Sequence, residues 1–298
     1  MRVLVTGVSG FSGSYVARFL AQAGFEVVGL YRRETALLGG LGAVPEIQLV
    51  RGDLVDAAAL PGPFEAVVHA AATSPGPGVS VARIVEDNVG GTFALIEAAL
   101  AWRTRYFLFC SSMSIYGGIT DEVVDENSAI QNPDVYGATK FLAERRLAEL
   151  SGTMPALALR LPGIIGPGAQ RNWLSGVAAG LRNGATIKAF HLDRPFNNAA
   201  HVGDIAALIE TVLRRGWTGF DAVVLGAAGM TTVRGAIERL AAGLAVPVRV
   251  ESAQAAKPSF TLSCTRAVAS YGYNPMDIEA MIDRYARELA ASDTTDRA

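Results

Sequence analysis

The chain begins with an apolar strand, a glycine-rich turn and a helix, and this order limits the folds that are open to it. Residues 2–6 are apolar and rich in β-branched side chains, which is typical of a buried strand. Glycines follow at three-residue spacing, at Gly7, Gly10 and Gly13. The helical periodicity after them ends at Gly24, where a glycine commonly closes a helix.

Elementary chemistry suits such a unit to a dinucleotide. Glycines let the backbone approach a pyrophosphate closely, and the N-terminus of the helix presents free N–H groups to the negative charge. Strand, turn and helix in succession form the context in which a glycine motif is informative. We therefore predict a cofactor-binding turn made of Gly7, Ser9, Gly10, Phe11, Ser12 and Gly13.

A second strand over residues 26–30 leads to the position that distinguishes two nicotinamide cofactors. NAD-binding chains usually place an acidic residue there, which accepts from the ribose hydroxyls. This chain has Tyr31, followed by Arg32 and Arg33. Two guanidinium groups and no carboxylate favour a 2′-phosphate, so we predict NADP in preference to NAD. NAD beside a solvated basic loop is the alternative.

Strand and helix patterns alternate to about residue 160, which predicts an α/β fold with a doubly wound parallel Rossmann sheet. After Gly166 the order loosens, with a strand expected around 196–200 and another at 246–250. We expect a smaller α/β substrate-binding lobe beside the sheet. The predicted division is residues 1–165 plus about 203–225 for the Rossmann domain, about 166–202 plus 226–291 for the lobe, and 292–298 for a flexible tail.

A tyrosine and a lysine one helical turn apart form the candidate catalytic pair. Asn132 and Pro133 are typical of an N-cap and a first helical residue. Tyr136 and Lys140 then fall on one face of the predicted helix. A free tyrosine has a pKa near ~10, and a nearby ammonium lowers it. We therefore predict that Tyr136 is the acid/base for a hydroxyl or ketone and that Lys140 tunes its pKa.

Together, the threonine before the glycines, their spacing and the tyrosine–lysine pair resemble the extended short-chain dehydrogenase/reductase family. That family contains nucleotide-sugar epimerases, dehydratases and reductases. The resemblance runs from Met1 to about Tyr285 and is strongest before Pro167. It implies that Lys140 also holds the nicotinamide ribose. It adds cofactor contacts at Asp53, Leu54, Ala70, Ala71, Ala72, Leu161 and Pro162.

Two further positions complete the catalytic set that the resemblance implies. Ser112 lies four residues before Tyr116, where the family places a hydroxyl that orients the substrate oxygen, and Ser111 is the alternative. Asn88 matches an Asn-x-x-Gly segment and would organise a helix near the site, although it could be an ordinary polar helix residue. The candidate catalytic residues are Ser112, Tyr136, Lys140 and Asn88.

The chain also departs from the family at positions that contact the substrate. Gly163 stands where an asparagine is usual, and Asn197 stands where an arginine usually grips a nucleotide-sugar pyrophosphate. Arg171 or Arg194 could supply the missing charge. His69 and His201 are interpreted as structural residues at strand ends rather than as catalysts.

Composition excludes several other classes of protein. The net charge of −2 over 298 residues offers no basic surface for nucleic acid. No run of ~18 apolar residues is present, so we expect no membrane span. The two cysteines, Cys110 and Cys264, lie far apart, and with three scattered histidines no metal site is expected. A cytoplasmic location fits this cysteine usage.

These observations predict an NAD(P)-dependent oxidoreductase that interconverts a secondary alcohol and a ketone on a small, sugar-like substrate. Arg32 and Arg33 favour net reduction by NADPH over a nucleotide-sugar 4-epimerase with retained NAD. A dehydratase is disfavoured, because Met113 and Ser114 stand where dehydratases carry an Asp–Glu pair. A non-catalytic NAD(P)-binding regulator is the alternative of another class. By analogy with relatives, a helix over 81–101 and the Tyr136 helix could form a homodimer contact.

Overall fold

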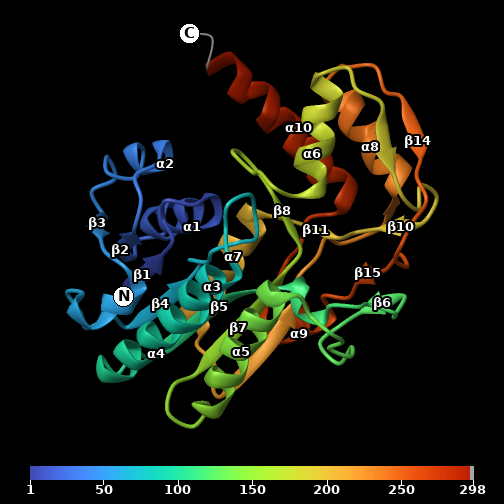
Figure 1. Cartoon of the computed structure of the whole chain (residues 1–298). Helices are drawn as coiled ribbons and strands as arrows, with labels where there is room; N and C mark the ends of the chain where they lie inside the picture. The colour runs from blue at the N-terminus through green and yellow to red at the C-terminus, as the bar shows by residue number, and fades with distance from the viewer. Residues whose placement is uncertain (296–298) are drawn as a thin grey trace.

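The computed structural model describes the backbone of residues 1–295 and the side chains of residues 1–291. Its centre is a seven-stranded parallel sheet in the order β12-β7-β5-β4-β1-β2-β3 (Figure 1). The strand order reverses between β1 and β4, and open parallel sheets bind ligands at the carboxyl ends beside such a point. The strands are β1 (Arg2–Thr6), β2 (Glu26–Tyr31), β3 (Ile47–Arg51), β4 (Ala66–His69), β5 (Tyr106–Ser112), β7 (Ala156–Leu161) and β12 (Phe220–Val224).

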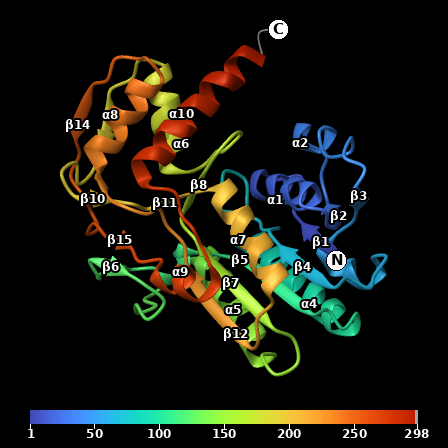
Figure 2. The same ribbon diagram turned by 180° about the vertical axis from the view of Figure 1, so that it is seen from behind.

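Helices cover both faces of the sheet, as expected for a doubly wound fold. α4 (Gly91–Ala101) and α5 (Val135–Glu149) lie on the face toward the viewer in Figure 1, and α7 (Val202–Arg215) lies on the opposite face, shown in Figure 2. α1 (Phe11–Gln22) packs beside α7. Side chains alternate across each strand, so Val3 and Val5 enter the core under α1 while Leu4 enters the core under α4.

The helix expected over 81–101 contains a wider turn at its centre. α3 (Val81–Val85) passes through a π-helical turn, η2 (Glu86–Gly90), into α4. Such turns are rare and frequently occur at functional sites. Here the turn carries the buried Asn88. Shorter elements on the same half of the chain are α2 (Ala36–Gly39), η1 (Leu54–Ala59) and η3 (Met113–Tyr116).

A second hydrophobic core lies outside the sheet and supports the two-lobe division, which we retain as a proposal. It is shared by α6 (Trp173–Arg182), α8 (Val233–Gly243) and α10 (Ile278–Thr295). α10 enters the segment expected to be a tail, and residues 296–298 lie outside the described part of the chain. Pairs of short strands surround this core: β8 (Gly163–Ile165) with β11 (Ala199–His201), β9 (Ile187–Ala189) with β14 (Val250–Ser252), and β10 (Pro195–Phe196) with β13 (Thr231–Thr232).

Several predicted boundaries were wrong. Asn132 has φ +48° and is not the N-cap of α5, because Asp134 caps the helix by accepting from Gly137 N at 2.7 Å. The strand expected at 246–250 begins only at Val250, and the one expected around 196–200 is divided into β10 and β11. The elements that were not predicted include β6 (Val123–Val124), β15 (Thr261–Leu262) and α9 (Thr265–Tyr271).

β12 forms one edge of the sheet, and side chains occupy two of its outward N–H groups. The amide of Ala222 donates to Asp221 Oδ1 at 2.8 Å, and the amide of Val224 donates to Glu126 Oε1 at 2.7 Å. Glu126 belongs to the long loop between η3 and α5, so this loop is attached directly to the sheet edge.

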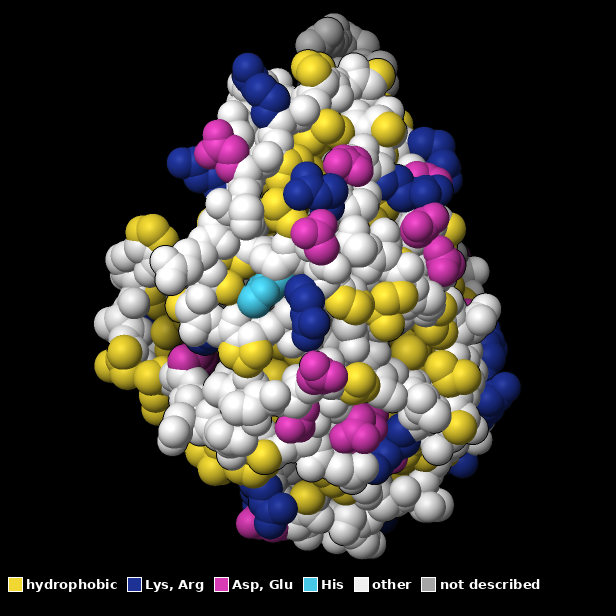
Figure 3. All heavy atoms as spheres, turned by 90° about the vertical axis from the view of Figure 1, so that its right-hand side faces the viewer, with side chains coloured by type: hydrophobic (Ala, Val, Ile, Leu, Met, Phe, Trp, Pro, Cys, Tyr) yellow, Lys and Arg dark blue, Asp and Glu magenta, His cyan; other side chains and the backbone are white. Residues whose placement is uncertain are grey.

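The surface carries charges of both signs. On the face in Figure 3, basic, acidic and apolar side chains are interspersed, and no single sign dominates. Among the described residues, no helix is both long and apolar enough to cross a membrane, and no group of three or more His, Cys, Asp or Glu side chains is arranged to hold a metal ion.

Candidate active site

A cavity of about 390 Å³ opens at the carboxyl ends of β1, β2, β3 and β4. It lies beside the reversal in strand order, where ligands of such sheets are bound. The predicted cofactor residues that line it are Gly7, Ser9, Gly10, Tyr31, Arg32, Arg33, Asp53, Leu54, Ala70, Ala71 and Ala72. Other predicted cofactor residues lie outside this lining, in the first turn of α1, at the end of β7 or on α5: Phe11, Ser12, Gly13, Leu161, Pro162, Tyr136 and Lys140.

The three glycines have different reasons for lacking a side chain. Gly7 has φ +74°, and a Cβ there would lie 2.8 Å from the Ala71 backbone, while a Cβ at Gly13 would collide with the Gly7 carbonyl. A Cβ at Gly10 would meet only the Gly7 carbonyl oxygen, at 3.3 Å, so a small shift would accommodate it. Internal packing therefore does not account for Gly10, which lines the cavity and begins α1 without a side-chain cap. This turn fits a pyrophosphate.

Arg32 is engaged by two carboxylates, which the sequence reading did not anticipate. Its guanidinium donates to both oxygens of Asp87 at 2.9 Å and to Asp53 at 3.2 Å. The bonds to Asp87 raise the pKa of Arg32, and the same guanidinium holds the pKa of Asp87 well below its usual range. The expectation that no carboxylate stands near the arginines was wrong for Arg32. Arg33 is exposed, lines the cavity and forms no ion pair within residues 1–291.

Asn88 connects the wall of the cavity to the catalytic helix. Its side-chain oxygen accepts from Thr73 N at 2.7 Å, and its amide donates to Thr73 O at 3.0 Å and to Thr139 Oγ1 at 3.3 Å. Thr73 also donates to Asp87 at 2.5 Å. Thr73 and Asp87 line the cavity but were not predicted, although a hydroxyl directly after Ala72 at a strand end was a usable signal. The contacts of Asn88 suit an organising role.

Tyr136 and Lys140 lie on α5 as predicted, with the Lys140 ammonium 5.8 Å from the centre of the Tyr136 ring. The ammonium donates to the Cys110 carbonyl at 2.7 Å rather than to the tyrosine. Burial raises the pKa of Tyr136 to about 12, while a hydrogen bond from Ser74 acts in the opposite direction. Lys140 therefore does not lower the pKa of Tyr136 in the chain without a ligand, contrary to the expectation. The tyrosine is protonated at neutral pH.

Lys140 is buried, which is unusual for an ammonium. Burial lowers its pKa to about 8, while Cys110 and Glu144 act to raise it. The Cys110 thiol has its own pKa raised by burial to about 11, so it is neutral near pH 7. The ionised group that supports the charge of Lys140 under these conditions is the Glu144 carboxylate.

The two serines at the end of β5 have separate environments. Ser111 is buried and donates to Glu144 Oε1 at 2.5 Å, so its hydroxyl is committed to that carboxylate. Ser112 is only partly buried and exchanges contacts with Ser114, at 3.1 Å to the amide and 3.2 Å to the hydroxyl. Ser112 therefore remains the better candidate for contact with a substrate oxygen.

The two histidines with structural interpretations lie in polar but enclosed positions. His69 contacts Thr6 Oγ1 at 2.7 Å and Thr92 Oγ1 at 2.9 Å, and burial lowers its pKa to about 3. His201 caps α7 by accepting from Gly203 N at 3.0 Å, and its other ring nitrogen contacts Glu288 at 3.0 Å. Both arrangements use the rings to hold the fold together.

Asn197, at the position where an arginine was expected, does not face a ligand. It is buried, and its side chain exchanges two hydrogen bonds of 2.8 Å with the backbone of Leu262. Arg194 contacts Glu122 at 3.4 Å on the surface, whereas Arg171 lines the cavity. Of the two arginines named as substitutes, only Arg171 is therefore near the cofactor site.

Comparison with known families agrees with this fold and site. Residues 3–229 match the model of the NAD dependent epimerase/dehydratase family. The match covers most of the chain, including the glycine turn, Asn88, Ser112 and the Tyr136–Lys140 pair. The chain belongs to this family, and the resemblance to the extended short-chain dehydrogenases/reductases is confirmed.

Curated relatives match over part of their length. The chain is 31% identical over 179 residues to a UDP-glucose 4-epimerase of Streptomyces lividans, covering 57% of this chain and 54% of the relative. It is also 31% identical over 199 residues to a D-erythronate dehydrogenase of Cupriavidus necator, covering 61% of each. The chain thus spans between about half and three-fifths of the length of these two relatives.

Solved structures share the fold over nearly the whole chain. A UDP-glucuronic acid 4-epimerase from Bacillus cereus superposes with a TM-score of 0.84 at 19% identity, covering 98% of this chain and 99% of the other. A UDP-glucose-4-epimerase from Stenotrophomonas maltophila gives a TM-score of 0.82 at 24% identity, covering 99% of both chains. The predicted α/β Rossmann architecture is therefore confirmed.

Proposed function

We propose that the chain is an NAD-dependent epimerase that inverts a secondary alcohol of a nucleotide sugar. The observation that carries this proposal is the combination of an open glycine turn at Gly10 with a Tyr136–Lys140 pair anchored on the end of β5. Family membership supports an oxidation–reduction at a sugar hydroxyl, and most of the similar proteins given above are 4-epimerases. Net reduction by NADPH, which we first expected, has less support.

The choice of NAD over NADP rests on Arg32. A 2′-phosphate would need a guanidinium free to donate, but Asp87 and Asp53 already accept from Arg32. Their carboxylates would also repel an additional phosphate. Arg33 alone remains available, and it is exposed to solvent, where charge pairing contributes little. NAD is also the cofactor bound in the two similar structures described above.

The chemistry needs a proton acceptor that becomes a donor. NAD, when bound, supplies a reversible acceptor for the hydride of a carbinol carbon. Tyr136 must be a tyrosinate before oxidation, and the positive charges of bound NAD and of Lys140 would favour that form over the neutral phenol of the free chain. The tyrosinate would take the hydroxyl proton during oxidation and return it to the ketone during reduction, while Ser112 donates to the substrate oxygen as negative charge develops there. Inversion requires the ketone to present its opposite face before the return step.

A second candidate is a dehydrogenase that oxidises a small sugar acid. It is favoured by Asn197, whose side chain is used to hold Leu262 and is not free to grip a pyrophosphate. The similarity to a D-erythronate dehydrogenase fits the same reading. In an epimerase, Arg171 would have to replace that pyrophosphate contact.

The two candidates differ in the fate of the cofactor. An epimerase retains NAD and forms no net reduced cofactor, whereas a dehydrogenase accumulates NADH. The test incubates the purified chain with UDP-glucose and, separately, with D-erythronate plus NAD. Conversion of UDP-glucose to UDP-galactose by proton NMR without NADH absorbance supports the epimerase. NADH formation with D-erythronate, but not with UDP-glucose, supports the dehydrogenase. If neither reaction occurs, both candidates are refuted.

We further propose that the chain forms a homodimer through α3 and α5. Apolar side chains are exposed on both helices: Val81 (59%) and Val85 (42%) on α3, and Val135 (38%) and Leu142 (46%) on α5. The two helices contact each other, so these side chains lie on neighbouring elements. Exposed apolar groups gathered in this way mark an association surface.

A further inference from the structure

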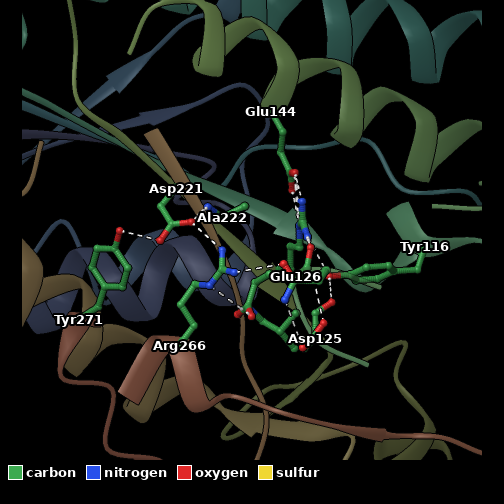
Figure 4. A network of polar contacts seen from close by, with 11 residues as sticks. Tyr116, Asp125, Glu126, Glu144, Asp221, Ala222, Arg266 and Tyr271 are labelled. Atoms are coloured by element: carbon green, nitrogen blue, oxygen red, sulfur yellow. Dashed lines mark hydrogen bonds and ion pairs between the residues drawn. The ribbon is translucent and has the colours of Figure 1, made fainter. Parts of the chain in front are cut away.

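A buried ion pair lies directly behind the candidate catalytic residues. Glu144 follows Lys140 by one turn of α5, and Arg160 lies on β7 beside β5. Arg160 donates to the Glu144 carboxylate at 2.8, 3.2 and 3.3 Å, and the two side chains are only 9% and 3% exposed. Figure 4 shows Glu144 within a larger polar network.

Each member of the pair reaches a different segment of the site. Glu144 accepts from Ser111, the neighbour of Ser112, at 2.5 Å. Arg160 donates to the hydroxyl of Tyr116 at 2.8 Å, at the end of the η3 turn that Ser112 caps. The strand and the turn that position Ser112 are thus both bonded to one ion pair, as the contacts around Tyr116 and Glu144 in Figure 4 illustrate.

Stability alone is a weak explanation for such an arrangement. Removing two charges from water costs several kcal/mol per ion, and well-packed apolar residues often replace a buried pair at no loss. A buried pair that also bonds two segments of the site suits a different role. We propose that Glu144 is a positioning residue, which aligns Ser112 through Ser111 and supports the positive charge of Lys140 one turn away on α5.

The second part of this role follows from the groups that face Lys140. These are the Cys110 carbonyl and thiol on β5, the imidazole of His69 on β4, and Tyr136 and Glu144 on α5. At neutral pH the thiol, the phenol and the imidazole are all uncharged. Glu144 is therefore the negative group among them, and it offsets part of the burial that lowers the pKa of Lys140.

Two variants separate alignment from charge. Ser111→Ala removes one hydrogen bond to Glu144 and leaves both charges in place. We expect kcat to fall on the order of tenfold with KM and NAD affinity unchanged, because misplacement near reacting groups lowers rate rather than binding. Glu144→Gln keeps the shape but removes the charge. We expect a larger loss of kcat, and the alkaline limb of the pH profile should move to lower pH.

A direct measurement does not depend on turnover. The ε-carbon NMR signal of Lys140 in lysine-labelled protein without ligand reports its protonation as the pH changes. We expect a midpoint near 8 in the wild type and in Ser111→Ala. In Glu144→Gln the midpoint should fall by about one unit, because an opposite charge is lost and Arg160 is left uncompensated.

Arg239→Gln is the matched control. Arg239 forms a two-point ion pair with Asp283 at 2.7 Å between α8 and α10, outside the candidate site. It should change neither kcat nor the Lys140 midpoint. Wild-type kcat in Ser111→Ala, or an unshifted midpoint in folded Glu144→Gln, would overturn the proposal. Should Glu144→Gln not fold, the kcat of Ser111→Ala decides alone.

This proposal rests on the proposed function only for its rate measurements, and the two can fail separately. The wild type could show no turnover with either substrate while the Lys140 midpoint shifts in Glu144→Gln. That result would refute the epimerase and dehydrogenase assignments and support the role of Glu144 toward Lys140. Turnover by the wild type with an unshifted Lys140 midpoint in Glu144→Gln would support the proposed function and refute the role of Glu144.

Discussion

The guanidinium of Arg32 and the carboxylate of Asp87 form a two-point ion pair in which both N–O distances are 2.9 Å. The two residues come from the end of β2 and from the π-helical turn, so they meet only after the sheet has formed. Their pairing occupies the guanidinium on which a preference for NADP would depend. It also makes the cofactor choice testable.

We expect the wild type to bind NAD at least about tenfold more tightly than NADP. Asp87→Ala frees Arg32 from its main partner, and hydrogen bonds to charged groups contribute roughly 1.5–3 kcal/mol. The ratio of NADP to NAD affinity should therefore rise by about tenfold in titration calorimetry. The same substitution in an Arg32→Ala background should show no rise. A wild type that already prefers NADP would contradict this reading of the ion pair.

Tyr136→Phe should reduce turnover to well below a tenth of the wild-type rate, because acid/base groups typically contribute ~10²–10⁴-fold. It removes one hydroxyl and little volume, so NAD affinity should stay within about threefold. Steady-state rates and titration calorimetry on the same preparation measure both effects. A variant that keeps most of its activity would exclude Tyr136 as the acid/base.

Gly10→Ala and Gly13→Ala should fail in different ways. Gly10 lines the cavity and its added methyl would meet only the Gly7 carbonyl oxygen, so we expect NAD affinity to fall by at least about tenfold while thermal unfolding changes little. At Gly13 the methyl collides with the Gly7 carbonyl, and a loss of about 3 kcal/mol or more in the free energy of unfolding is expected. Equal NAD affinity in folded Gly10→Ala and wild type would mean that the cofactor does not lie against Gly10.

His69 should make the stability depend on pH in the acid range. Its folded pKa of about 3 lies below the ordinary value of 6.5, so the unfolded chain binds more protons between these values. Stability therefore falls as the pH decreases from 6.5 towards 3, by roughly 2 kcal/mol between pH 6 and 4.5. His69→Asn, which cannot titrate, should show a shallower slope in urea unfolding. Parallel slopes would remove His69 as the cause.

Leu142→Lys should disrupt the proposed dimer, because it places a charge within the exposed apolar surface on α3 and α5. Light scattering during size exclusion should report a dimer for the wild type and a monomer for the variant at micromolar concentration. Val123→Lys, another exposed apolar position but on β6, is the control and should leave the dimer intact. A monomeric wild type would refute the association surface.

Local patterns sufficed where local chemistry decides the structure. The glycine turn, the strands of the sheet and the Tyr136–Lys140 spacing follow from short-range periodicity, and the structure places them as expected. Elements built by distant pairing were missed. β6 pairs with β15 through Val123 and Thr261, and no short-range signal connects residues so far apart in the chain.

The same distinction between local patterns and distant contacts applies to the residues of the site. Asp87 was not predicted, because its partnership with Arg32 depends on how β2 and the π-helical turn meet. Likewise Asn197 was known to be an unusual residue at its position, but its bonds to Leu262 required the fold. The pKa of Tyr136 was expected to fall through Lys140, whereas burial, which a sequence does not display, raises it.

The contacts of the edge strand β12 affect whether the protein aggregates with other chains. An exposed strand edge is a template on which another chain can add a strand and begin a fibre. Here the outward amides of Ala222 and Val224 are occupied by the carboxylates of Asp221 and Glu126, both of which are labelled in Figure 4. An incoming strand would have to displace two acidic groups that are also held by Arg266, at 3.2 Å to Asp221 and 3.6 Å to Glu126. The sheet is therefore protected on this side against growth into an aggregate.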